Sequence, residues 1–557
     1  MVGTKQPADQ YRPPLDSPSS SVDDTGDADT SAGVGILAEA GGASARSSDK
    51  RPQTSMEHAA RAKRLTISAH APSNPSELDA VELSVSGSSK GGEDLCEECA
   101  TICFDEETIM SQMSSLQSSK YIHGFVKLDE KCMLCDLFRK TIEHYKITGP
   151  TGSHPFYCIE AIRFDGVPGV MLKLSQLKDL GKSGWLLFGS NSAFPGAERL
   201  FARDIQSDKI NWAAVKQWLQ YCDTEHEDSC GSVKMMQLPG FRVIDCTTRR
   251  IVEAPKECKF VALSYVWGSD SSPGLRLKLP TKVPLLIEDA ITCTKAIGLR
   301  YLWIDRYCID QESGDSKHTL IRNMDQIYSG AAVTIINVAG TSSHSGLPGV
   351  SHTTRRPLAS VSVHNKSTSL RLLPNSRAEV AESKWSTRGW TYQEGLLPRR
   401  RLVFTSSQIY FQRLEMHSCE VLPIHFLTRD TTTTFGRALG RKMRVFPSLS
   451  RMAYADTVEL RIEEYLQREL SYESDVLNAI MGILRHICVH FWGLPIDSPR
   501  RYCPRAFGAN EGFLAALMWI PEAEGSKLGI SRRAGFPSWS WAAWKGITGI
   551  GKTYLLY

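Results

Sequence analysis

The chain has 557 residues, of which 41% are hydrophobic, and its 65 lysines and arginines nearly balance its 61 aspartates and glutamates. A chain of this length exceeds what one hydrophobic core serves, so two or three folded units are expected. A formal charge of +4 is too small to indicate nucleic acid or an anionic membrane surface as the main partner.

The sequence shows neither the apolar run of a membrane span nor the pattern of a secretory signal. No apolar run reaches the roughly 18 residues that a membrane span needs, and the first residues lack the positive and apolar pattern of a secretory signal. The fifteen cysteines are therefore expected to be thiols or metal ligands in a reducing compartment, with the cytoplasm as the predicted location. A short basic cluster at Arg61–Arg64 leaves the nucleus as an alternative.

The first 92 residues differ in composition from the rest of the chain. They are rich in Ser, Gly, Asp, Ala and Pro, and Tyr11 is the single aromatic residue among them. Such a segment cannot bury enough apolar surface to offset the entropy of the chain. Residues 1–92 are therefore predicted to be disordered.

Residues 93–240 are predicted to be a folded N-terminal region of the α+β type that contains two CxxC pairs. Thirty-two residues separate the pairs, and the spacing within each pair is compatible with a structural Cys₄ zinc site. Two alternatives remain open: a mixed site with later residues, or ordinary buried cysteines on helices, where residues i and i+3 share a face. The candidate zinc ligands are Cys96, Cys99, Cys132 and Cys135, and the later residues are Cys222, His226 and Cys230.

Residues 241–420 alternate strand and helix patterns, which predicts a parallel sheet with right-handed crossovers. One helix opens at Pro284 and ends near Gly298, and a second begins near Ser316. The predicted strands are Phe260–Trp267, Tyr301–Asp305, Ala332–Val338, Arg401–Thr405 and Gln408–Gln412.

The carboxyl ends of these strands are the expected place for a ligand, because parallel sheets usually bind ligands beyond those ends. The ends carry Ser264–Gly268, Asp305–Asp310 and Gly340–Ser343. We therefore predict that Ser264, Tyr265, Trp267 and Gly268 line a pocket. The alternative is that these side chains satisfy turn hydrogen bonds and fill the core.

The last region, residues 421–557, is predicted to be mainly helical and ends in the Trp-rich stretch Pro537–Trp544. Beyond it, Gly546–Thr553 matches the phosphate-loop pattern GxxxxGK[ST]. A phosphate loop needs a following helix whose N-terminal amides face the phosphates. Only four residues follow Thr553, so we interpret the match as coincidental, and the alternative is a truncated gene model that lacks a downstream NTPase domain.

Three aromatic-rich blocks carry a resemblance to a known family. They are Ala262–Gly268, Leu302–Gln311 and Arg388–Glu394, and together they resemble the fungal heterokaryon-incompatibility (HET) domain in both order and spacing. The resemblance implies a role in nonself recognition between fungal cells and in the programmed cell death that follows incompatible fusion. It also implies that partners are further copies of the chain or other incompatibility proteins.

HET domains are in turn distantly similar to TIR domains, which have a flavodoxin-like parallel sheet and some of which hydrolyse NAD. Those enzymes place a catalytic glutamate in a Trp-Cys-x-x-Glu pattern. Here Trp390 and Glu394 have that spacing, with Thr391 in place of the cysteine. The resemblance therefore names Glu394 as the candidate catalytic acid and NAD as the candidate substrate.

Cleavage of the bond between nicotinamide and ribose passes through an oxocarbenium-like state that a carboxylate can stabilise. An indole of Trp390 or Trp267 can stack on a base, and Arg388 can pair with a pyrophosphate oxygen. Asp305 either contacts a ribose hydroxyl or caps the loop that follows it. The opposing interpretation is a structural ion pair between Arg388 and Glu394 beside a packed tryptophan.

Two other functions compete with NAD hydrolysis. The first is a non-catalytic module that self-associates and signals through partners. The second is a thiol hydrolase that uses Cys308 with His318, which requires a base and an orienting group near the thiol. Because free cysteines are among the most buried residues, a packed thiol is the favoured interpretation of Cys308.

Overall fold

The computed structural model describes residues 95–114, 117–147, 156–164, 167–176, 179–189, 199–225, 238–268, 277–312, 314–363, 368–413, 416–423, 443–447, 456–487, 490–491, 494–495, 519–522, 530–547 and 549–552. The segment predicted to be disordered, residues 1–92, lies outside the described residues. None of the helices in the described ranges has the length and apolar character that crossing a membrane requires.

A mixed eight-stranded sheet is built from residues 242–419, in the order β14-β13-β12-β9-β7-β8-β5-β6. The four inner strands run parallel, because β7 pairs with β8 and β9, and β9 pairs with β12. They are β7 (Phe260–Ser264), β8 (Tyr301–Trp303), β9 (Val333–Asn337) and β12 (Arg400–Phe404). The outer strands pair antiparallel and are β5 (Arg242–Asp245), β6 (Arg250–Glu253), β13 (Ile409–Arg413) and β14 (His417–Cys419).

The strands and helices from β7 to β9 follow the predicted alternation with two differences. The strand expected to reach Asp305 ends at Trp303, and Asp305–Cys308 form the short helix α7. The second predicted helix is interrupted at Asn323, which separates α8 from α9. The remaining bounds are α6 (Leu285–Ala296), α8 (Gly314–Arg322), α9 (Met324–Gly330), α10 (Ser376–Ala381) and α11 (Thr391–Leu396).

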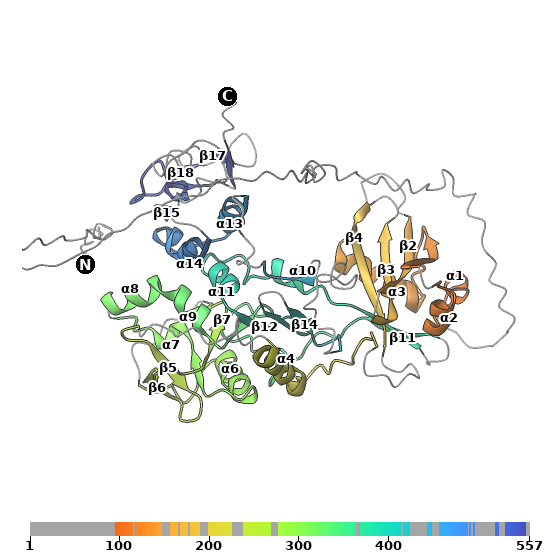
Figure 1. The fold of residues 1–557 in the computed structure, drawn as a ribbon, viewed down its shortest axis with the longest axis horizontal. Helices are drawn as coiled ribbons and strands as arrows, with labels where there is room; N and C mark the ends of the chain where they lie inside the picture. The colour runs from red at the N-terminus through yellow and green to blue at the C-terminus, as the bar shows by residue number, and fades with distance from the viewer. Residues whose placement is uncertain are drawn as a thin grey trace, which may run out of the picture. The chain divides into compact units, whose positions relative to one another are not determined.

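A second, antiparallel sheet of six strands has the order β1-β2-β3-β4-β11-β10. Its first four strands come from the N-terminal region, and β10 and β11 come from residues 360–372. Figure 1 shows β11 beside the strands of the N-terminal region, β2 to β4. These strands are β1 (Ser119–Phe125), β2 (Tyr157–Phe164), β3 (Val167–Gln176), β4 (Asp179–Phe188), β10 (Ser360–Val363) and β11 (Thr368–Leu372). The sheet thus joins chain segments from the two regions that the sequence separates at residues 240 and 241.

Four helices belong to the N-terminal region: α1 (Glu97–Ala100), α2 (Glu106–Ser111), α3 (Met133–Tyr145) and α4 (Trp212–Glu225). Helix α3 packs on β4 and β10, and its last turn binds the chain that follows β11. The Tyr145 hydroxyl donates to the carbonyl of Leu373 at 2.7 Å, and the Asn375 amide donates to His144 Nε2 at 2.8 Å. The N-terminal region is therefore bonded to the segment that leads to α11.

The C-terminal region contains more strand than predicted. Besides its helices, it forms three two-stranded sheets, β15-β16, β17-β20 and β18-β19. Strand β20 contains Gly551 and Lys552, so the glycine and lysine of the phosphate-loop pattern lie in a paired strand, which confirms that the match is coincidental. The elements are α13 (Asp456–Leu466), η4 (Glu473–Val476), α14 (Asn478–Ile487), β15 (His490–Phe491), β16 (Leu494–Pro495), β17 (Trp519–Glu522), β18 (Ser531–Arg532), η5 (Trp541–Ala543), β19 (Trp544–Lys545) and β20 (Gly549–Lys552).

Two hydrophobic cores support these sheets. The larger one surrounds the eight-stranded sheet and reaches from Phe164 to the Trp-rich stretch, where Trp541 is fully buried and packs edge-on against Tyr465. The smaller one lies between the six-stranded sheet and helices α1 to α3 and includes Phe104 and Phe138. Burial of large aromatic side chains is the main stabilising contribution in both cores.

Candidate active site at the strand ends

A chain of hydrogen bonds lies at the carboxyl end of β7. Ser264, the last residue of this strand, is fully buried, and its hydroxyl donates to Glu394 Oε2 at 2.5 Å. The indole Nε1 of Trp385 donates to the same serine oxygen at 2.8 Å. Since a hydroxyl has only one proton to donate, the bond from Trp385 leaves that proton for the carboxylate. The two bonds therefore fix the direction of the serine hydroxyl.

Glu394 lies in α11, which contacts β7, and only 5% of the residue is exposed. Burial raises the pKa of its carboxyl to about 7, and the negative charge of Asp305 adds to the rise. The Ser264 hydroxyl, the charge of Arg388 and the Tyr328 hydroxyl act in the opposite direction. Desolvation is the dominant effect because it removes water from the charged form.

Asp305 is the first residue of α7 and is separated from β8 by Ile304 alone, one strand away from Ser264. Its carboxylate accepts hydrogen bonds from the indole Nε1 of Trp267, at 2.9 Å to Oδ2, and from the backbone amide of Arg306, at 2.7 Å to Oδ1. Burial raises the pKa of Asp305 to about 6 despite these donors. Two carboxyl groups with raised pKa values are thus held at neighbouring parallel strands, Glu394 through Ser264 at the end of β7 and Asp305 after β8, and the charge of Asp305 acts on Glu394.

Arg388 supplies positive charge to both carboxyl groups and lowers the pKa of each. The residue is half-buried, and its guanidinium forms no salt bridge within the part of the chain that the structure describes. Its carbonyl oxygen accepts from Arg468 Nη1 at 3.2 Å. The ion pair between Arg388 and Glu394 that the opposing interpretation requires is therefore not found among the described contacts, although their charges interact.

Of the other predicted pocket residues, Tyr265 lies near Asp305, because burial and then the charge of Asp305 raise the pKa of its hydroxyl, whereas Trp390 and Gly268 have other contacts. Trp390 donates its indole Nε1 to Asp475 Oδ2 of η4 at 3.2 Å, so this ring is bonded to the C-terminal region. Tyr265 is buried, with 4% of it exposed. Gly268 is exposed at a φ of +81°, which favours glycine, and a Cβ there would lie 3.1 Å from Ser342 Cβ.

The segment that precedes α11 is fastened by backbone bonds to the C-terminal region. Gly389 N donates to Glu469 O at 2.7 Å, and Glu469 N donates to Thr387 O at 2.6 Å. A Cβ on Gly389 would lie 2.5 Å from Leu470 Cδ2, so a larger residue there would require the Leu470 side chain to move. These bonds hold the Arg388-Gly389-Trp390 motif in place, and with it the start of the helix that carries Glu394.

Sequence reasoning did not identify Trp385 and Tyr328 as neighbours of Glu394. Trp385 begins the same aromatic-rich stretch as Trp390, but spacing does not show which of the two indoles faces Ser264. Tyr328 lies on the buried face of α9 beside Ile327, so its position in the sequence indicates a core residue. Both partners depend on how distant segments pack, which periodicity does not report.

A cavity of about 230 Å³ lies elsewhere and is not lined by Glu394, Ser264 or Asp305. Its walls include Arg203, Asn211, Arg355 and Glu420. Arg355 and Glu420 are almost completely buried and form a salt bridge through Nη1 and Oε2 at 2.5 Å. This cavity was not predicted from the sequence.

The remaining candidates fall into two groups. Cys96, Cys99, Cys132 and Cys135 lie together beneath the six-stranded sheet, whereas Cys222 belongs to the other core, and His226 and Cys230 lie outside the described residues. Cys308 is 1% exposed, and burial raises the pKa of its thiol to about 12, while His318 is exposed on α8. This arrangement favours the packed thiol over a catalytic Cys308.

Comparison with known proteins gives one match. Residues 260–394 match the family model described as heterokaryon incompatibility protein (HET). No curated protein and no solved structure matches the chain, so the similarity to TIR domains has no support from these comparisons. The match begins at the first residue of β7 and ends at Glu394, and therefore spans the strand ends and both carboxyl groups. The chain thus contains a HET domain at residues 260–394, the domain type of heterokaryon incompatibility proteins.

Proposed function

We propose that this protein acts in heterokaryon incompatibility and that its HET domain hydrolyses NAD with Glu394 as the catalytic carboxylate. The observation that carries the proposal is the pair of carboxyl groups, Glu394 and Asp305, whose pKa values are raised to about 7 and about 6. Perturbed carboxyl groups that converge on the ends of parallel strands are typical of functional sites. Arg388 brings a half-buried positive charge to the same place.

The order of the parallel strands supports a flavodoxin-like or TIR-like fold for the domain. Counted along the chain, the parallel strands appear in the sheet as second, first, third and fourth, that is β8, β7, β9 and β12. Flavodoxin-like sheets share this order, and they bind their ligand where the first and third strands adjoin. Ser264 ends the first of these strands, so its bonded partner Glu394 lies near this point.

The proposed reaction breaks the bond between ribose C1′ and the nicotinamide nitrogen, and the electron pair leaves with neutral nicotinamide. The positive charge that develops on the ribose is stabilised by the Glu394 carboxylate. Water then adds to C1′, and its proton passes to Glu394, so the products are nicotinamide, ADP-ribose and a proton. A carboxyl with a pKa of about 7 suits this proton transfer near neutral pH. Arg388 binds a pyrophosphate oxygen in this scheme.

The test uses the full chain incubated with NAD, with released nicotinamide measured by chromatography. We expect turnover that falls by at least about a hundredfold in Glu394→Gln. The matched control is Glu464→Gln, which removes a carboxylate that accepts from Tyr392, a neighbour of Glu394 in α11. Turnover that survives Glu394→Gln, or that falls equally in both variants, would overturn the catalytic role.

A second candidate is a non-catalytic module that self-associates or binds other incompatibility proteins. It is favoured by the 5% exposure of Glu394 and by the absence of this residue from the lining of the described cavity. In this alternative, the chain from Trp385 through Ser264 to Glu394 only orders the core. A full chain that forms oligomers in light scattering but releases no nicotinamide at any protein concentration supports the module.

We propose that the protein is cytoplasmic, in keeping with its fifteen cysteines, and that its activation leads to programmed cell death. Expression of the wild type and of Glu394→Gln in a fungal host tests this, with viability and NAD content measured together. Loss of viability without a fall in NAD assigns the death response to the non-catalytic alternative.

A further inference from the structure

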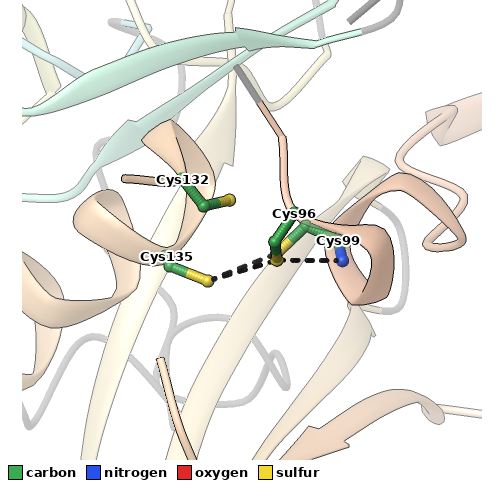
Figure 2. A group of neighbouring side chains, drawn as sticks. All are labelled: Cys96, Cys99, Cys132 and Cys135. Carbon is green, nitrogen blue, oxygen red and sulfur yellow. Dashed lines mark hydrogen bonds between the residues drawn. The ribbon is translucent and has the colours of Figure 1, made fainter. Parts of the chain in front are cut away.

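Four sulfur atoms from two distant parts of the chain meet beneath the six-stranded sheet (Figure 2). Cys96 precedes α1 and Cys99 lies in it, while Cys132 precedes α3 and Cys135 lies in its first turn. All four ligand atoms lie within 4.8 Å of one another. Each CxxC pair presents its two sulfurs on one side because residues three apart share a helix face.

The spacing of the sulfurs fits a tetrahedral metal centre. Zinc–sulfur bonds of about 2.3 Å in a tetrahedron place neighbouring sulfurs about 3.8 Å apart. In the structure, Cys135 Sγ lies 3.8 Å from Cys96 Sγ and 3.5 Å from Cys99 Sγ. A disulfide requires about 2.05 Å. The sulfurs therefore have the separation of ligands around one ion, and four sulfur ligands in a tetrahedron select zinc or iron.

Hydrogen bonds fix the backbone next to the cysteines of both pairs. Cys99 N donates to Cys96 Sγ at 3.5 Å. Before the second pair, the Asp129 carboxylate accepts from the amides of Lys131, at 2.7 Å, and Cys132, at 3.0 Å, which fixes the turn that leads into α3. Hydrogen bonds of this kind orient ligands before an ion arrives and increase metal affinity.

We propose that Cys96, Cys99, Cys132 and Cys135 bind one Zn²⁺ in a closed structural site. The reasoning uses only the cysteine geometry and is independent of the proposed NAD hydrolysis. A closed Cys₄ centre leaves no position for a substrate, so the ion contributes to folding and not to chemistry. Binding of Zn²⁺ displaces protons from the thiols, which couples the site to folding of the region.

The ion would add a direct link between α1 and α3, which otherwise meet through packing in the smaller core. Helix α1 has only four residues, too few to be stable alone. Zinc would tie it to α3, whose other end binds Leu373 and Asn375. The site would therefore stabilise the N-terminal region and, through α3, the chain segment that enters α10.

The test is metal analysis of the full chain, purified under reducing conditions. We expect about one zinc per chain, and a content near zero in Cys132→Ser and Cys135→Ser. The matched control is Cys103→Ser, because Cys103 lies four residues after Cys99 and outside the cluster. The control should keep its zinc, and a chelator should lower the unfolding temperature of the wild type and of this control alike.

Wild-type protein alone gives a second test if the cysteine variants do not fold. Replacement of the metal by Co²⁺ should give the visible absorption of a tetrahedral cobalt–thiolate centre. Iron instead of zinc would overturn the choice of metal. A disulfide found by mass spectrometry of the reduced-state preparation, or metal-free protein that does not take up Co²⁺, would overturn the site itself. NAD turnover plays no part in these measurements, so the two proposals fail independently.

Discussion

Ser264 connects an indole on one side to a carboxylate on the other, and this connection determines the environment of Glu394. The sequence allowed Ser264 and Glu394 to be predicted as candidate residues, since one ends a strand and the other belongs to a recognisable motif. It did not allow Trp385 to be predicted as the donor to Ser264. Which indole faces a strand end depends on the path of residues 373–390, and local sequence does not specify that path.

The raised pKa of Glu394 predicts a pH-dependent stability. The folded protein keeps the proton up to about pH 7, whereas the unfolded chain releases it near 4.5, so this carboxyl destabilises the fold progressively as pH rises between those values. We expect the free energy of unfolding of Glu394→Gln to increase relative to that of the wild type between about pH 5 and about pH 8. The gain should be on the order of 3 kcal/mol, at 1.36 kcal/mol per pKa unit.

Urea unfolding followed by tryptophan fluorescence at both pH values measures this difference. The glutamine keeps an oxygen that can accept from the Ser264 hydroxyl, so the comparison isolates the charge. If the difference in unfolding free energy between the two proteins is the same at both pH values, Glu394 is not buried in a protonated state.

At the scale of elements, the strands formed by continuous buried residues were predicted well. A helix break caused by a polar side chain that bonds to the backbone was not predicted. Strands β7 and β9 lie inside the predicted ranges because every one of their residues is buried. The helix break at Asn323 was missed: its side chain donates to the Thr319 carbonyl at 2.8 Å, four residues earlier. A side-chain amide that bonds to the backbone in this way competes with the regular helix.

Two glycines at the ends of helices give a matched prediction. Gly298 follows α6 at a φ of +86°, while Gly314 begins α8 without a positive φ, and an added Cβ meets nothing within 4 Å at either position. Gly298→Ala should therefore destabilise the protein by about 1 kcal/mol, because only its backbone is unsuited to alanine. Gly314→Ala should be neutral or stabilising by up to about 1 kcal/mol.

Unfolding midpoints of the two variants, measured side by side, check this prediction. Since neither methyl group meets a neighbour, packing does not contribute to the difference. Equal effects at the two positions would show that the left-handed backbone at the end of α6 is not maintained.

At the scale of the whole molecule, the sheet shared by residues 157–188 and 360–372 could not be predicted from the sequence. Strand β11 pairs with β4 through Leu370 with Phe188 and Leu372 with Leu186. Such pairings join segments almost two hundred residues apart, and strand periodicity predicts a strand without naming its partner. The division at residues 240 and 241 therefore follows the chain and not the packing.

This pairing predicts how fragments behave. A fragment of residues 241–420 leaves one edge of β11 unpaired and exposes Leu370 and Leu372, which are buried in the full chain. We expect it to aggregate, because an uncovered apolar strand edge promotes association. A fragment of residues 91–557, which is one compact unit, should remain soluble.

Soluble yield and size-exclusion chromatography of the two fragments give the comparison. A monomeric, folded 241–420 fragment would show that β10 and β11 do not need the N-terminal strands. Aggregation of both fragments would mean that residues 1–90 contribute to solubility.

The backbone bonds between Gly389 and Glu469 have a consequence for damaged alleles of the gene. A premature stop codon or frameshift shortly after residue 420 would preserve every position of the family match, yet it would delete Glu469 and Asp475, to which Gly389 and Trp390 are fastened. The protein from such an allele would still contain the complete HET domain. It would lack the contacts that hold the start of α11, the helix that carries Glu394. Loss-of-function changes in this protein are therefore to be sought well downstream of the HET domain as well as inside it.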